Sequence, residues 1–143
     1  MGSLEAWLLT RSLRTLTLRV HQQSATANAL ANWLYDTWKQ SIEVYHTSIA
    51  HCQGHLVAKS QGTGWSGVMS VVFVSADQAK QFCASLSLFT HATSLGGCES
   101  LVEWRFKSDP TIAPGLCRLS IGLENYEDLR DDISNALNQI FKS

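Results

Sequence analysis

Residues 115–137 read GLCRLSIGLENYEDLRDDISNAL, and this stretch predicts a strand followed directly by a helix. In Leu116 to Leu123, apolar residues alternate with others, and a period of two places successive side chains on opposite faces of a strand. We expect the helix to start at Asn125, with acidic residues in its first turn, where the helix dipole favours anions. Apolar residues then recur at helical spacing and predict a buried stripe of Leu129, Ile133, Ala136, Leu137 and Ile140.

Arg118 lies in the middle of this predicted strand, on the face opposite Cys117, Leu119 and Ile121. Only 16% of the residues are charged, so a guanidinium at this position needs a partner. One candidate partner is an acidic side chain such as Glu99 or Glu103. The other is the carboxylate of a ligand, which a guanidinium holds with two parallel hydrogen bonds. The residues by themselves favour the acidic side chain.

Three further strands and one further helix are predicted upstream of this stretch. Residues 67–74 are almost continuously apolar, which suits a strand buried on both faces. Ser75 and Gln78 then form a capping box for a helix. Residues 88–93 predict a short strand, and residues 101–106 another. In the latter strand, alternation places Val102, Trp104 and Phe106 on one face and Glu103 and Arg105 on the other.

The first forty residues predict helices. Residues 4–20 have partial helical spacing, and a clearer helix follows with Ser24 as its expected N-cap; the alternative is that the two stretches form one bent helix. A short helix is also expected near residues 55–59. Together these elements predict an α+β fold of two layers, with a small, mostly antiparallel sheet and helices packed on one face. We expect a single domain over residues 1–143, with a helical lead-in segment at 1–40 and the sheet and remaining helices at 41–143.

Composition limits the classes of protein to which this chain can belong. The chain has 143 residues and a mass of 15.8 kDa, which suits one domain. A net charge of -1 argues against nucleic acid or an anionic membrane as the main partner. The sequence contains neither a run of 18 apolar residues nor a secretory signal. We therefore expect a cytoplasmic protein with reduced thiols at Cys52, Cys83, Cys98 and Cys117.

Two motifs that suggest chemistry do not fit their context. Residues 62–67 read GTGWSG and satisfy the dinucleotide fingerprint, but they precede a predicted strand instead of following one. His51, Cys52 and His55 suggest zinc, with His46 as a fourth ligand. Structural zinc usually takes two close ligand pairs, and the sequence offers no second pair. We therefore predict no metal site and no catalytic residue in this chain.

Several stretches resemble one enzyme family, in the order in which that family has them. SLGGCESLVEW at 94–104 and the stretch at 115–137 are similar to the C-terminal end of the cystathionine γ-synthase/γ-lyase family. These enzymes of cysteine and methionine metabolism use pyridoxal phosphate (PLP). The segments EAWLLTRSLRTLTLR, GWSGVMSVVF and SLFTHATSLGG, at 5–19, 64–73 and 87–97, resemble further motifs of the family. The resemblance thus spans essentially the whole chain.

The resemblance implies roles for three residues. Arg118 corresponds to the arginine that binds the substrate α-carboxylate in the family, and Ser94 corresponds to a serine in the same wall of the active site. The position before that serine is usually acidic and helps to set the substrate and the reaction. Here it is Thr93. We therefore expect Arg118, Ser94 and Thr93 to bind substrate, and the threonine leaves the choice of reaction open.

The resemblance also implies that the large PLP-binding domain is absent. In the family, the lysine that binds PLP lies in an S-x-T-K motif of that domain. None of the lysines here lies in such a motif: Lys39, Lys59, Lys80, Lys107 and Lys142. PLP chemistry requires this lysine. We expect PLP in the intact enzyme, no cofactor on this chain alone, and no activity from this chain alone.

The function implied for the intact enzyme is γ-replacement on an activated homoserine ester, as in cystathionine γ-synthases. The alternatives are a cystathionine lyase or a homoserine-ester sulfhydrylase of the same family, or a non-catalytic module that binds partners. The expected partners are an amino-acid substrate, the missing large domain and further copies of the enzyme in a homo-oligomer.

Overall fold

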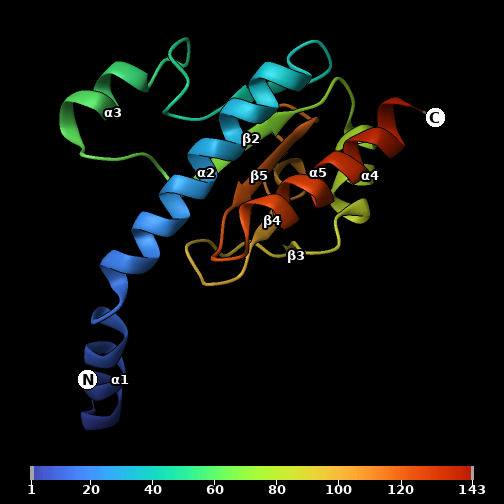
Figure 1. Ribbon diagram of the computed structural model, residues 1–143. Helices are drawn as coiled ribbons and strands as arrows, with labels where there is room; N and C mark the ends of the chain where they lie inside the picture. The colour runs from blue at the N-terminus through green and yellow to red at the C-terminus, as the bar shows by residue number, and fades with distance from the viewer. Residues whose placement is uncertain (1, 143) are drawn as a thin grey trace.

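A five-stranded, mixed sheet forms the centre of the molecule, with the strand order β1-β2-β5-β4-β3 (Figure 1). The structure is a computed structural model that describes residues 2–142. All neighbouring strands pair antiparallel except β3 and β4, which are parallel. The elements are α1 (Ser3–Leu13), α2 (Leu16–Trp38), β1 (Glu43–Tyr45), α3 (His55–Gln61), β2 (Val68–Val72), α4 (Ala76–Ser85), β3 (Thr90–His91), β4 (Leu101–Trp104), the 3-10 helix η1 (Arg105–Lys107), β5 (Leu116–Ser120) and α5 (Tyr126–Phe141).

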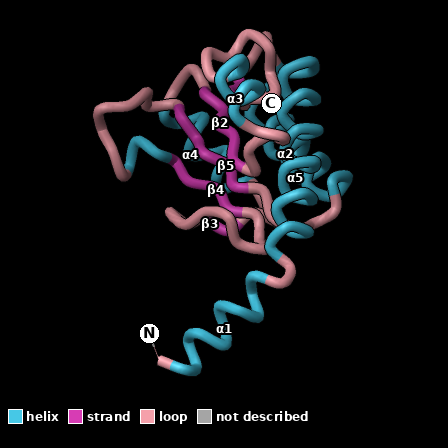
Figure 2. Tube along the Cα trace, turned by 90° about the vertical axis from the view of Figure 1, so that its left-hand side faces the viewer, coloured by secondary structure: helices cyan, strands magenta, loops and turns pink. Residues whose placement is uncertain are grey.

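Helices α2, α4 and α5 share one hydrophobic core with the sheet, so the predicted two-layer α+β fold is confirmed. Cys117 and Leu119 of β5 are fully buried, and Cys117 Sγ lies 3.6 Å from the carbonyl oxygen of Ala79 in α4. Figure 2 shows α2 and α5 running side by side next to the sheet. Helix α5 contributes the fully buried Leu129, Ile133, Ala136 and Leu137 of the predicted stripe. The opposite face of β5, which carries Arg118, is not covered by these helices.

Only half of the predicted capping box at Ser75 forms, since the Gln78 side-chain oxygen is buried without a partner, and Asn125, where the last helix was expected to start, is the N-cap of α5. The Ser75 hydroxyl accepts a hydrogen bond from the Gln78 N–H of α4 at 3.2 Å. Asn125 Oδ1 accepts one from the Glu127 N–H of α5 at 2.8 Å. Each bond satisfies a donor that the first turn of a helix otherwise leaves unpaired.

The predicted N-cap at Ser24 is wrong, because α2 begins at Leu16 and Ser24 lies inside it. The Ser24 hydroxyl instead donates to the Trp65 carbonyl at 2.6 Å and accepts from the Trp65 N–H at 3.1 Å. Ser24, whose sequence context predicts an N-cap, thus fixes the loop that leads into β2. The partner of Ser24 is thus a residue 41 positions away and not the N–H groups of a helix start.

Some strand boundaries also differ from the predictions. β2 alternates between buried and half-buried residues instead of being buried on both faces, and Val74 is 90% exposed. The predicted strands at 88–93, 101–106 and 116–123 shorten to β3, β4 and β5. After β4 the chain enters η1, which turns Arg105 back toward Glu103.

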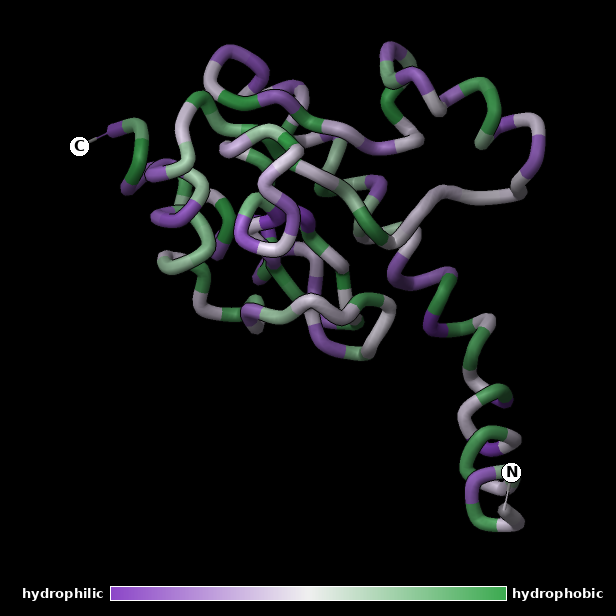
Figure 3. The backbone as a smooth tube through the Cα atoms, turned by 180° about the vertical axis from the view of Figure 1, so that it is seen from behind, coloured by the Kyte–Doolittle hydropathy of each residue, from purple (hydrophilic) through white to green (hydrophobic). Residues whose placement is uncertain are grey.

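Helix α1 and the start of α2 form an arm that extends away from the sheet (Figures 1 and 3). No residue of α1 is buried. The exposed large apolar residues of the arm are Leu4, Trp7, Leu8, Leu9, Leu13, Leu16, Leu18 and Val20. Within residues 2–142, none of the helices combines the length and the apolarity that a membrane crossing needs.

Candidate functional site

Arg118 stands in a row of side chains across the uncovered face of the sheet. In the strand register it pairs with Ser70 of β2 on one side and with Glu103 of β4 on the other. Residues directly opposite each other in antiparallel strands point to the same face. Since Cys117 and Leu119 face the helices, Arg118 faces away from them, as the sequence alternation predicts.

The Arg118 guanidinium is held at one nitrogen by three oxygens. Its Nη2 donates to the carbonyl oxygens of Thr93 at 2.7 Å and Ser94 at 2.9 Å, and it lies 2.9 Å from Oε2 of Glu103. The Arg118 side chain is 15% exposed. The structure therefore brings together all three residues that the resemblance singles out, but Thr93 and Ser94 contact Arg118 through their backbone.

Of the two acidic partners considered for Arg118, the structure selects Glu103. This carboxylate is 2% exposed, although it lies on the face without helices. Besides Arg118 it receives Nη1 of Arg105 at 3.1 Å from each of its oxygens and the Ser108 hydroxyl at 2.7 Å. Burial by itself raises the pKa of Glu103, but the hydrogen bonds from Ser108 and Arg105 and the charges of Arg118 and Arg105 outweigh it and lower that pKa.

The lowered pKa predicts how Glu103 contributes to stability as pH changes. A carboxyl whose folded pKa lies below its unfolded value, about 4.3 for glutamate, stabilises the fold above that value and loses this contribution as pH falls through the folded pKa. Glu103→Gln should therefore be less stable than the parent chain at neutral pH, and the difference should shrink as pH falls below about 4. Urea unfolding of both chains across this pH range measures it. A difference that stays constant with pH would contradict the ion-pair assignment.

The loop that presents the Thr93 and Ser94 carbonyls is fixed at several points. Gly96 has a φ of 77°, which side-chain-bearing residues rarely adopt, and its N–H donates to the Ser120 hydroxyl at 2.9 Å. The carbonyl of Gly97 accepts from the Gln23 amide of α2 at 2.5 Å. Local sequence does not mark Gln23 or Ser120 as supports of this loop, because both contacts join segments far apart in the chain.

The free part of the Arg118 guanidinium defines what the site can bind. Within residues 2–142, Nη1 makes no hydrogen bond, and Nε is buried without a partner. Nη2 is already shared among three oxygens. A carboxylate that approaches Nη1 meets a charged donor held in place by the loop and by Glu103. This arrangement suits the binding of one carboxylate group.

The described residues do not fit an anchor for PLP. That cofactor needs a lysine for its Schiff base. No lysine in residues 2–142 makes a hydrogen bond or ion pair with Arg118, Glu103, Thr93 or Ser94. Lys80 pairs instead with Asp77 at 3.3 Å, on α4.

The residues weighed as zinc ligands have other partners. Both ring nitrogens of His46 are engaged, with the Ser48 hydroxyl at 2.7 Å and the Ser66 carbonyl at 2.8 Å. His55 stacks on Trp65, and His51 lies against Tyr35. Burial lowers the pKa of His46. Within the described residues, no group of three or more His, Cys, Asp or Glu side chains is placed to hold a metal ion.

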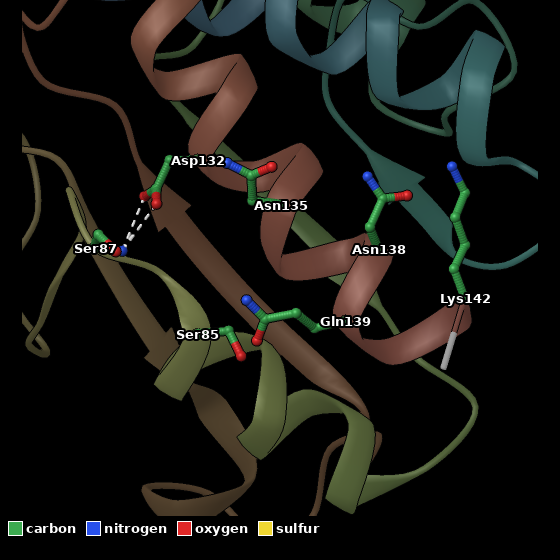
Figure 4. A pocket seen from close by; sticks show the side chains of 7 residues that line it. All are labelled: Ser85, Ser87, Asp132, Asn135, Asn138, Gln139 and Lys142. Atoms are coloured by element: carbon green, nitrogen blue, oxygen red, sulfur yellow. Dashed lines mark hydrogen bonds between the residues drawn. The ribbon is translucent and has the colours of Figure 1, made fainter.

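A hollow of about 570 Å³ lies away from Arg118, between the end of α4 and the outer side of α5 (Figure 4). Its lining is polar: Ser85, Ser87, Asp132, Asn135, Asn138, Gln139 and Lys142. Figure 4 shows Asp132 bonded to the Ser87 backbone at one end of this hollow. None of these residues makes a hydrogen bond or ion pair with Arg118, Glu103, Arg105, Thr93 or Ser94, which we call the Arg118 cluster. The hollow is therefore not part of the candidate site.

Comparison with known proteins supplies the family. Residues 1–138 match the model of the family described as Cys/Met metabolism PLP-dependent enzyme. The chain belongs to this family. Enzymes of the Cys/Met metabolism family use PLP, and the solved structure of metB from Corynebacterium glutamicum, 34% identical to this chain, superposes with a TM-score of 0.88. That match covers 94% of this chain and 37% of the metB chain.

The names of relatives within the Cys/Met metabolism family state different activities. Cystathionine beta-lyase of Lactococcus lactis subsp. cremoris is 36% identical over 96% of this chain, and this chain covers 39% of that enzyme. Cystathionine gamma-synthase of Escherichia coli is 34% identical over 94% of this chain and is covered to 38%. The chain thus spans about two fifths of the length of these relatives. Family membership does not by itself select one reaction.

Proposed function

We propose that this chain supplies substrate recognition to a PLP-dependent transsulfuration enzyme of the cystathionine γ-synthase type. Such an enzyme replaces the γ-substituent of an activated homoserine ester with a thiol. The observation that supports this proposal is the Arg118 guanidinium, which lies on the sheet face away from α2, α4 and α5. Among residues 2–142 its Nη1 has no partner, and its Nη2 is fixed by the Thr93 and Ser94 carbonyls.

In this proposal Arg118 binds the α-carboxylate of the amino-acid substrate. Fixing that carboxylate orients the rest of the substrate. Part of the entropy loss that the reaction requires then occurs already on binding, which lowers the barrier of the chemical step. Thr93 and Ser94 hold the guanidinium through their carbonyls and border the site with their exposed side chains. The lysine that binds PLP would come from a large domain that acts together with this chain, because no lysine of residues 2–142 contacts the Arg118 cluster.

A substrate panel tests the reaction type. The chain joined to a PLP-binding domain of the family is assayed with homoserine esters plus a thiol, with cystathionine, and with homoserine esters plus sulfide. Preferential turnover of an ester with a thiol supports the γ-synthase assignment. Preferential cleavage of cystathionine selects the lyase alternative, and preferential use of sulfide selects the sulfhydrylase.

The rival from another class is a non-catalytic module that binds partners. We expect the isolated chain to show no PLP absorbance band and no turnover. Borohydride treatment in the presence of PLP should trap no specific adduct at a single lysine, as read by mass spectrometry. A single trapped lysine together with activity would overturn the proposal that this chain relies on a separate domain for its cofactor.

The exposed arm predicts how the isolated chain behaves in solution. Leu8 and Leu13 are 50% and 55% exposed, and contiguous apolar patches of this kind usually mark interfaces. We propose that a large domain covers the arm in the intact homo-oligomeric enzyme and that the isolated chain self-associates as its concentration rises. Sedimentation velocity measures this, and Leu8→Glu with Leu13→Glu should reduce it. A strictly monomeric profile at millimolar concentration would count against the prediction.

A further inference from the structure

Arg105 has no role in the proposed function, yet it contacts Glu103, the ion-pair partner of Arg118. Its Nη1 lies 3.1 Å from both oxygens of Glu103, and Oε2 of Glu103 lies 2.9 Å from Nη2 of Arg118. Two cations therefore flank one buried anion. The three side chains together carry one net positive charge.

The charge balance decides how strongly Arg118 attracts an anion. Without Arg105, Glu103 would offset much of the attraction of Arg118 for a carboxylate that approaches Nη1, because the negative charge of Glu103 lies 2.9 Å from Nη2 of the same guanidinium. Glu103 is 2% exposed, so water screens this repulsion only weakly. The positive charge of Arg105, on the far side of Glu103, offsets the repulsion.

We propose that Arg105 is a positioning residue that acts through Glu103: it fixes the Glu103 carboxylate and keeps the cluster at one net positive charge, which makes Arg118 a receptor for a single carboxylate. This inference rests on the proposed role of Arg118. Glu103 holds the guanidinium in place, and Arg105 keeps Glu103 from cancelling its charge. The ligand class is a monocarboxylate such as the α-carboxylate of an amino acid.

The test measures protection of Arg118 from phenylglyoxal, a reagent that modifies guanidinium groups, by acetate. The full chain is used at low micromolar concentration and constant ionic strength, and mass spectrometry reads the initial rate at Arg118. The acetate concentration that halves this rate reports its affinity. Acetamide, which has the same shape without the charge, is the control ligand and should not protect.

Arg105→Gln is expected to raise the half-protecting acetate concentration by about three- to tenfold, because the cluster becomes neutral while Arg118 keeps its direct contacts. Arg105→Lys keeps the charge and should stay within about twofold of the parent chain. Arg130→Gln is the matched control: it removes the same charge from an exposed arginine that pairs with Asp131 on α5. It should leave protection unchanged.

A double variant separates charge from packing. Glu103→Gln combined with Arg105→Gln returns the cluster to one positive charge, so acetate protection should recover toward that of the parent chain. Equal protection in Arg105→Gln and Arg130→Gln, or no recovery in the double variant, overturns the role of Arg105 and leaves the proposed function standing. A parent chain in which acetate does not protect Arg118 overturns both.

Discussion

Arg118→Lys is expected to lower kcat/KM of the enzyme formed with the PLP-binding domain by roughly a hundredfold or more, while the fold survives. Nη2 of Arg118 contacts Thr93, Ser94 and Glu103 at once, and in the proposed function Nη1 binds the substrate. A lysine ammonium has a single nitrogen. It cannot bind the loop carbonyls, the Glu103 carboxylate and a ligand in the geometry that the two Nη atoms of arginine allow. It keeps the charge beside Glu103, however, which limits the loss of stability.

Steady-state kinetics and thermal unfolding of the same variant check this prediction together. Arg130→Lys makes the same chemical change at an exposed arginine that pairs with Asp131, and it should alter neither quantity. Normal turnover by a folded Arg118→Lys enzyme would show that Arg118 serves only Glu103 and the loop. Failure of the variant to fold would show that Arg118 serves stability first.

Asp132→Ala is expected to destabilise the fold by about 1.5–3 kcal/mol, because it removes the charged acceptor of two backbone N–H groups. Asp132 is 9% exposed, and its carboxylate accepts the Ser87 N–H at 2.9 and 3.1 Å (Figure 4) and the Leu88 N–H at 2.9 Å. These bonds tie α5 to the segment between α4 and β3. That segment continues toward Thr93 and Ser94, so its loosening should also weaken acetate protection of Arg118.

Denaturant unfolding measures the first effect, and the phenylglyoxal assay measures the second. Asp131→Ala removes the neighbouring carboxylate, which is 62% exposed and pairs only with Arg130 among the described residues. It should change stability little, since exposed ion pairs contribute little. Equal stability of the two variants would show that the Ser87 and Leu88 donors find water in place of Asp132.

The strand and helix at 115–137 could be predicted because local and tertiary preferences agree there. The alternation around Arg118 and the apolar stripe of α5 both match the side on which the core lies. Ser75 and Asn125 cap the helices whose starts the sequence predicted near them, since a cap needs only residues within the same turn. Ser24 shows the opposite case. Its local sequence suggests a cap, but α2 begins at Leu16, and the Ser24 hydroxyl bonds to Trp65 from inside the helix.

The candidate site also has features that local sequence predicts and features that it does not. Sequence by itself determined that Arg118 faces away from the helices, because alternation along a strand is a local property. Alternation also predicted that Glu103 and Arg105 share a strand face, but β4 ends at Trp104 and η1 brings Arg105 to Glu103 instead. Only the tertiary structure decided that Glu103, and not Glu99, is the partner, that Arg105 and Ser108 complete its surroundings, and that Thr93 and Ser94 act through their carbonyls. These choices depend on strand register and on the fold of the loop around Gly96. Both are set by contacts between distant segments, which a linear pattern does not record.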